Sequence, residues 1–189
     1  MTKSFQFGLL TASVLALSSS AAFADYQLNI LHINDFHSRI EAINKFDSTC
    51  SAEEESKKEC FGGAARLKTA IDQRRAALAG QNVLTLNAGD NFQGSLYYTT
   101  YKSKVVSDFF NQMGFDVVAT GNHEFDDGPE EFLKFIEAAE FPIIGGNFDV
   151  TRDENLRGKI KGSIVIEVGG EKIGIIGAGN IGGTIGGLW

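Results

Sequence analysis

Short apolar runs alternate along the chain with longer segments whose apolar positions recur every three or four residues. The short runs predict strands, because glycine, asparagine or aspartate follows most of them. The expected strands cover residues 26–33, 83–86, 115–120, 141–147, 163–168 and 172–176. Gly169-Gly170, between the last two runs, predicts the turn of a hairpin.

Three segments between these strands have helical periodicity. Residues 64–79 place leucine and isoleucine side chains on one face, and Gly80 ends the segment. Residues 101–113 and the segment that begins near Pro129 show the same pattern. The alternation of strands and helices predicts an α/β layered domain. Most of the 15 phenylalanines fall at core positions of these elements, so we interpret them as packing residues.

The first 24 residues have the pattern of an export signal. Lys3 provides a positive start, residues 7–17 are apolar, and Ala22-Phe23-Ala24 is a small-residue cleavage site. The apolar run is too short to span a bilayer as a helix, and a lipid-facing anchor is the alternative. We therefore expect a periplasmic or extracellular protein that begins near Asp25 and has no membrane contact after signal removal.

The charge of the chain disfavours one class of partner. The formal net charge is -7, and loss of Lys3 with the signal would make it about -8. An acidic chain without a basic stripe is not expected to bind a nucleic acid polymer. A small anionic substrate would need a local positive charge, which metal ions can provide.

Cys50 and Cys60 are the only cysteines, and they flank a charged insert without apolar periodicity. In an exported protein such a pair is expected to form a disulfide, with two free thiols as the alternative. A zinc site at these two cysteines is disfavoured, because no further cysteine or nearby histidine completes four ligands.

Three of the expected strands end in polar residues that can bind metal ions. Asp35 and His37 follow the first strand, Asp90 follows the second, and Asn122 and His123 follow the third. Open α/β sheets bind ligands at this end of their strands. Carboxylate, imidazole and amide ligands suit zinc, manganese, iron or cobalt. Asp90 has the carboxylate that could bridge two such divalent ions.

His123 is a candidate for acid–base chemistry rather than for metal binding. It adjoins the proposed ligand Asn122, and Asp126 follows three residues later, where it can orient the imidazole. A histidine in this position could protonate the leaving group and stabilise transition-state charge.

Together these strings resemble the calcineurin-like metallophosphoesterases, and in particular their exported 5'-nucleotidase branch. The similarity extends from about Leu28 to Gly177. It rests on Asp35-Phe36-His37, Gly89-Asp90 and Gly121-Asn122-His123-Glu124 in that order. It implies a β-sandwich flanked by helices, and hydrolysis of a small-molecule nucleotide at a site with two divalent metal ions.

The resemblance also implies a role for each matching residue. It implies that Asp35 and His37 bind the first metal ion, that Asp90 bridges both and that Asn122 binds the second. It implies that His123 and Asp126 are the catalytic pair.

Three other residues in the matching strings have structural interpretations. Strand alternation turns His32 away from its neighbours, so we expect a structural role for it. We expect Arg39 to be solvated or to form a local ion pair, and Glu124 to hold its loop.

The chain departs from the family pattern downstream. The family completes its site with further histidines in Gly-His motifs and has a C-terminal substrate-binding domain, whereas this chain has three histidines and none after His123. We therefore expect residues 25–189 to be the N-terminal part of a metallophosphoesterase domain, incomplete at the C-terminus. The alternatives are a non-catalytic metal-binding remnant or assembly module, and a related cyclic-phosphodiesterase or sugar-nucleotide hydrolase.

The glycine-rich end of the chain, from Gly177, has the spacing Gly-x-Gly-x-x-Gly after an apolar strand. A dinucleotide site would also need a helix, a returning strand and an acidic residue about 20 positions on. Only seven residues follow Gly182, so this interpretation is disfavoured.

Overall fold

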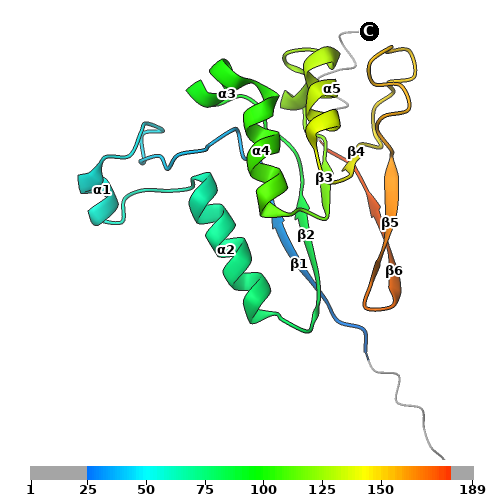
Figure 1. Ribbon diagram of the computed structural model, residues 1–189, viewed down its shortest axis with the longest axis horizontal. Coiled ribbons are helices and arrows are strands. Elements are labelled where there is room, and N and C mark those ends of the chain that lie inside the picture. The colour runs from blue at the N-terminus through cyan, green and yellow to red at the C-terminus, as the bar shows by residue number, and fades with distance from the viewer. Residues whose placement is uncertain (1–24, 180–189) are drawn as a thin grey trace, which may run out of the picture.

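A four-stranded parallel sheet forms the centre of the computed structural model, which describes residues 25–179 (Figure 1). Its strands lie in chain order: β1 (Leu28–Ile33), β2 (Asn82–Asn87), β3 (Val117–Ala119) and β4 (Ile143–Ile144). The α/β layered prediction is confirmed, although β3 and β4 are shorter than expected. The expected export signal and the last ten residues, 180–189, lie outside the described residues.

Three helices lie along one face of this sheet (Figure 1). They are α2 (Ala64–Ala77), α4 (Ser103–Met113) and α5 (Pro129–Ala138). Pro129 occupies the first turn of α5, where a missing N–H costs nothing, and Gly114 ends α4 in the left-handed conformation. No helix within residues 25–179 is long and apolar enough to cross a membrane.

Phenylalanine side chains fill the core between the helices and the sheet. Phe92, Phe110, Phe132 and Phe135 are fully buried, and the rings of Phe92 and Phe135 meet edge to face at 5.1 Å. Such pairs add about 0.5–1.5 kcal/mol to the gain from burial. The interpretation of these residues as packing is confirmed, and the core supports the loops at the carboxyl ends of the strands.

An antiparallel hairpin contributes a second, two-stranded sheet. Its strands β5 (Ser163–Val168) and β6 (Glu171–Ile176) pair across the expected Gly169-Gly170 turn. Leu84, Val117 and Ile144 are buried on the sheet face opposite the helices, and β5 contacts β2. On the same face Ile30 is 52% exposed. Within residues 25–179, the hairpin therefore covers this face only in part.

Three short helical segments were not expected from the sequence. The segments are α1 (Ala52–Ser56), α3 (Leu96–Tyr101) and the single 3-10 turn η1 (His123–Phe125). Capping explains α1 and α3: Ser51 and Glu54 form a reciprocal capping box, and the hydroxyl of Ser95 accepts from the backbone N–H of Tyr98. These segments are too short for their apolar periodicity to be recognised.

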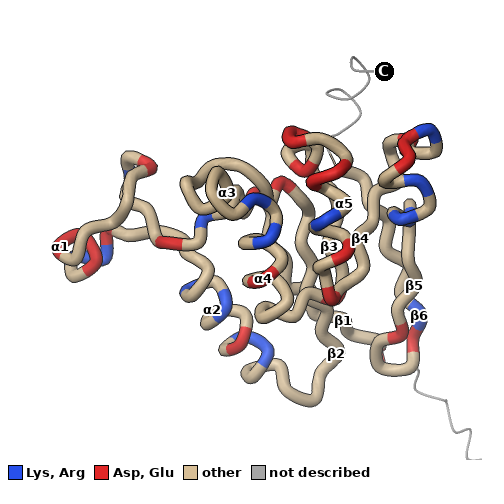
Figure 2. Tube along the Cα trace, turned by 45° about the horizontal axis from the view of Figure 1, so that its top comes forward, with Lys and Arg blue, Asp and Glu red and all other residues tan. Residues whose placement is uncertain are grey.

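The insert that contains α1 stands away from the rest of the fold (Figure 2). It carries three consecutive glutamates, and α1 contributes no buried residue. A disulfide joins Cys50 to Cys60 across its base, with the two Cα atoms 5.9 Å apart. The predicted disulfide is confirmed. It constrains a segment that has no core of its own.

Candidate metal centre

Backbone pairing continues beyond β1 and β2 and brings the loops that follow them side by side. The backbone N–H of Asp35 donates to the carbonyl of Gly89 at 2.9 Å, and that of His37 donates to the carbonyl of Asp90 at 3.1 Å. The polar residues that end two separate strands therefore become neighbours, as the sequence predicts.

The backbone of these two loops adopts left-handed conformations that are unusual for residues other than glycine. Asp35, His37, Ser38 and Asp90 all have positive φ angles, between 46° and 58°. Such conformations cost free energy and persist where the surrounding structure imposes them, which is common at functional sites. Here the bend turns the side chains of the two loops toward the same point.

The side chains of Asp35, His37 and Asp90 converge there, with one ligand atom of each within 4.8 Å of the others. Nε2 of His37 lies 3.6 Å from Oδ1 of Asp35. Nδ1 of His37 lies 3.2 Å from the carbonyl oxygen of Phe92, to which it can donate. This arrangement leaves Nε2 available for a cation, in the tautomer that metal-binding histidines commonly adopt.

Asn122 joins this group from the end of β3. Its side-chain amide lies 3.2 Å from Oδ2 of Asp90. Either the amide NH2 donates to that carboxylate or, with a cation between them, the amide oxygen and the carboxylate face the same ion. The donor set of carboxylate, imidazole and amide groups therefore suits divalent cations, with Asp90 in the middle.

His123 lies beside this group and is oriented by Asp126. Nδ1 of His123 and Oδ2 of Asp126 are 2.6 Å apart, a short charge-assisted contact. The hydrogen bond that His123 donates to the carboxylate of Asp126 raises the pKa of His123, against the opposing effect of burial. The imidazole rings of His37 and His123 lie 5.0 Å apart, edge to face. His123 can therefore present Nε2 toward the same space as the candidate metal ligands.

The loops after β2 and β3 touch through two glycines. A Cβ atom on Gly121 would lie 2.2 Å from the backbone nitrogen of Asp90, and one on Gly89 would lie 2.4 Å from the nitrogen of Gly121. Neither position accepts a side chain without displacing backbone. This close approach brings Asp90 and Asn122 within hydrogen-bond distance.

Glu124 is completely buried behind these loops and accepts hydrogen bonds from both of them. The expectation that Glu124 holds its loop is confirmed. Burial raises the pKa of Glu124 to about 7. Two buried asparagines, Asn87 and Asn91, belong to the same hydrogen-bond network and were not identified from the sequence. Their position beside Gly89-Asp90 was the only signal available.

The remaining histidine and the arginine of the matching strings lie outside the group. His32 is exposed on the sheet face away from the helices, as strand alternation predicts. Nη2 of Arg39 contacts Oδ1 of Asp47 at 2.7 Å, so the expected local ion pair is confirmed.

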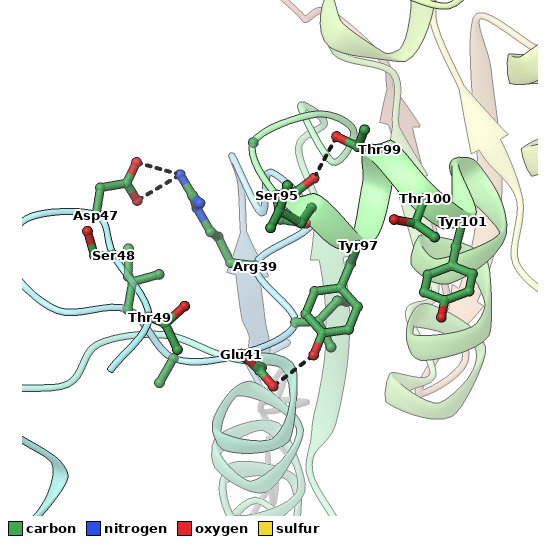
Figure 3. A pocket seen from close by; sticks show the side chains of 15 residues that line it. Arg39, Glu41, Asp47, Ser48, Thr49, Ser95, Tyr97, Thr99, Thr100 and Tyr101 are labelled. Atoms are coloured by element: carbon green, nitrogen blue, oxygen red, sulfur yellow. Dashed lines mark hydrogen bonds and ion pairs between the residues drawn. The ribbon is translucent and has the colours of Figure 1, made fainter. Parts of the chain in front are cut away.

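A cleft of about 850 Å³ opens between residues 39–49 and α3 (Figure 3). Arg39 and Asp47 form one side, and Tyr97 lies on the other, where its hydroxyl donates to Glu41. Among the described residues, no predicted metal ligand or catalytic residue lines this cleft. The cleft is therefore lined by other residues than the candidate metal centre.

Comparisons with known proteins find relatives over most of the chain. The sequence profile of the family described as calcineurin-like phosphoesterase matches residues 28–183. A 5'-nucleotidase of Homo sapiens is 40% identical over 157 residues, and an apyrase of Tabanus yao is 39% identical over 159. These alignments cover 80% and 84% of this chain, but 26% and 28% of the relatives.

Solved structures match in the same way. A 5'-nucleotidase precursor from Thermus thermophilus superposes with a TM-score of 0.68 and 36% identity, over 80% of this chain and 28% of that chain. An NAD nucleotidase from Haemophilus influenzae also gives a TM-score of 0.68, with 29% identity, over 84% of this chain and 27% of that chain. The present chain therefore spans less than a third of the length of these proteins.

Proposed function

The chain belongs to the calcineurin-like phosphoesterase family, and on that premise we propose that it forms the metal-binding part of a hydrolase that cleaves the phosphoester of a small nucleotide. The observation that carries this proposal is the convergence of Asp35, His37 and Asp90 within 4.8 Å. The names of the relatives, which include 5'-nucleotidases and apyrases, support a nucleotide as the substrate.

The proposed ligand assignment is the one that the family resemblance implies, and the positions of the three loops are compatible with it. Asp35 and His37 would hold one divalent cation, Asn122 would hold a second, and Asp90 would contact both. Cations bound in this way supply an activated water and neutralise the charge of the phosphoryl oxygens. Zinc, manganese, cobalt and iron are all compatible with these donors.

His123 is the proposed general acid. Asp126 fixes the imidazole through Nδ1, so Nε2 is free to give a proton to the leaving oxygen of the nucleoside. Because Asp126 raises the pKa of His123, a larger fraction of His123 carries the Nε2 proton near neutral pH.

We also propose export of the protein to the periplasm or the extracellular space. The export-signal pattern of residues 1–24 and the disulfide between Cys50 and Cys60 support this proposal, because disulfides persist in oxidising compartments. The substrate would then be a nucleotide outside the cytosol.

A non-catalytic metal-binding module is the second candidate function. It is favoured by ligand number, because Asp35, His37, Asp90 and Asn122 are few side chains for two cations. Such a module would bind metal ions without turnover. It could also pair with a partner that provides the missing ligands.

Phosphate release from AMP tests the proposal. We expect the full chain to release phosphate with Mn²⁺, to lose this activity with EDTA, and to regain it when Mn²⁺ is restored. Calorimetry on the same sample measures Mn²⁺ binding. Binding without phosphate release would favour the non-catalytic module, and the absence of Mn²⁺ binding would reject both candidates.

A further inference from the structure

Glu124 connects the two loops that carry the central candidate ligands. Its Oε1 accepts from the backbone N–H of Asn91 at 2.8 Å and from the side-chain NH2 of Asn91 at 2.9 Å. Its Oε2 accepts from the backbone N–H of Gly121 at 2.9 Å and of Asp90 at 3.2 Å. Four N–H groups therefore surround one buried carboxylate, and they come from the loop after β2 and the loop after β3.

The hydrogen bonds that lead to Glu124 all run in one direction. The backbone N–H of Gly89 donates to Oδ1 of Asn87 at 2.7 Å, and Nδ2 of Asn87 donates to Oδ1 of Asn91 at 2.7 Å. Nδ2 of Asn91 then donates to Glu124. All four hydrogen-bond partners of the Glu124 carboxylate are N–H groups, so Glu124 accepts from each of them. This sets the orientation of the Asn91 amide and, through it, that of the Asn87 amide.

This chain of hydrogen bonds begins at the turn that carries Asp90. Asp90 has a φ of 58°, and Gly89 has a φ of 98°. The Asn87 amide fixes the N–H of Gly89, and Glu124 fixes that of Asp90. Oδ1 of Asp90 in turn accepts from the backbone N–H of His123 at 3.1 Å. The orientation of the bridging carboxylate thus depends on groups outside the candidate ligand set.

We infer that Asn87, Asn91 and Glu124 form a one-directional hydrogen-bond relay that positions Asp90 for metal binding. Asn91 is its central positioning residue, because it is fully buried and joins the amide of Asn87 to the carboxylate of Glu124. The effect of Asn91 on metal affinity rests on the proposed function. Its effect on the order of the loops after β2 and β3 does not.

Asn91→Asp tests the direction of the relay, because it preserves size and shape but replaces the NH2 donor with an oxygen. That oxygen would face Oε1 of Glu124, which lies 2.9 Å from the present nitrogen. We expect Mn²⁺ affinity, measured by calorimetry, to fall about 10–100-fold, the usual cost of losing a group that orients a metal ligand. Asn87→Ser is a milder second variant that interrupts the relay one step earlier.

A compensating change separates the relay from a general loss of packing. In Asn91→Asp combined with Glu124→Gln, the glutamine NH2 can donate to the new aspartate, and the glutamine oxygen can still accept from the backbone N–H of Gly121. The exchange costs the hydrogen bond from the backbone N–H at position 91, so the recovery is expected to be partial. We expect the double variant to bind Mn²⁺ more tightly than Asn91→Asp alone, a coupling that a double-mutant cycle measures. Strictly additive losses would overturn the relay.

Glu131→Gln is the matched control. Glu131 is a second buried glutamate, and its carboxylate accepts from the backbone N–H and the hydroxyl of Ser103, outside the relay. Its replacement is expected to lower the midpoint of denaturant unfolding and to leave Mn²⁺ affinity unchanged. An equal loss of affinity in this control would also overturn the inference.

Amide hydrogen exchange without metal keeps the test independent of the proposed function. In Asn91→Asp, or in Asn87→Ser if the first variant does not fold, the N–H groups of Asn91 and Gly121 should exchange faster than in the wild type, while those of α4 keep their protection. Unchanged protection at both amides would refute the relay, whether or not the wild type binds Mn²⁺ or releases phosphate.

Discussion

Replacement of Asp90 by asparagine is expected to remove metal-dependent phosphate release and to weaken Mn²⁺ binding. The loss of affinity should exceed the loss of about 10–100-fold that follows when a residue that only orients a metal ligand is replaced. Asparagine keeps the size of the side chain and tolerates the left-handed φ of 58° at this position. The variant therefore loses mainly the negative charge of the carboxylate. Calorimetry with Mn²⁺ and phosphate release from AMP measure the two effects.

Asp47→Asn is the matched control for this prediction. Asp47 also has a left-handed backbone, with a φ of 60°, and it is exposed and paired with Arg39 rather than with the metal group. Its replacement should change neither Mn²⁺ affinity nor phosphate release. The assignment of Asp90 fails if Asp90→Asn binds Mn²⁺ as tightly as this control.

Replacement of His123 by alanine is expected to lower kcat for AMP by about 10²–10⁴-fold while Mn²⁺ affinity stays unchanged. The proposed role of His123 is to protonate the leaving oxygen, and a nucleoside alkoxide needs that proton. The leaving group of p-nitrophenyl phosphate is a stable phenolate that needs no proton. The loss with p-nitrophenyl phosphate should therefore be much smaller than the loss with AMP.

Two further variants complete this experiment. Asp126→Asn removes the carboxylate that lies 2.6 Å from Nδ1 of His123, so it should reproduce the His123→Ala pattern with a smaller loss. His32→Ala, at an exposed histidine on the opposite sheet face, should have no effect. An equal loss with AMP and p-nitrophenyl phosphate would contradict the general-acid role.

The sequence predicts the main part of the fold because β1 and β2 are apolar runs and because α4 and α5 have strong apolar periodicity. It also predicts the proximity of Asp35 and Asp90, because parallel strands bring their carboxyl ends to one edge of a sheet. The backbone hydrogen bond from Asp35 to Gly89 joins the two loops and agrees with that expectation. These features depend on patterns that extend over many residues.

The features that were missed depend on single side chains. The helix α1 forms where Ser51 and Glu54 cap each other, in a segment without apolar periodicity. Asn87 and Asn91 are polar residues near a strand end, a position where polar residues usually face solvent. Their burial becomes clear only when Glu124 is placed behind both loops, because its carboxylate pairs with the amide of Asn91.

The central claim is that the loops after β1, β2 and β3 bind divalent cations around Asp90. Anomalous X-ray scattering from crystals of the full chain grown with Mn²⁺ tests this claim directly. We predict two peaks about 3.5–4 Å apart, the usual spacing in two-metal sites, one beside Asp35 and His37 and one beside Asn122, with Asp90 between them. The absence of a peak at this edge, or ordered Mn²⁺ only elsewhere on the protein, would contradict it.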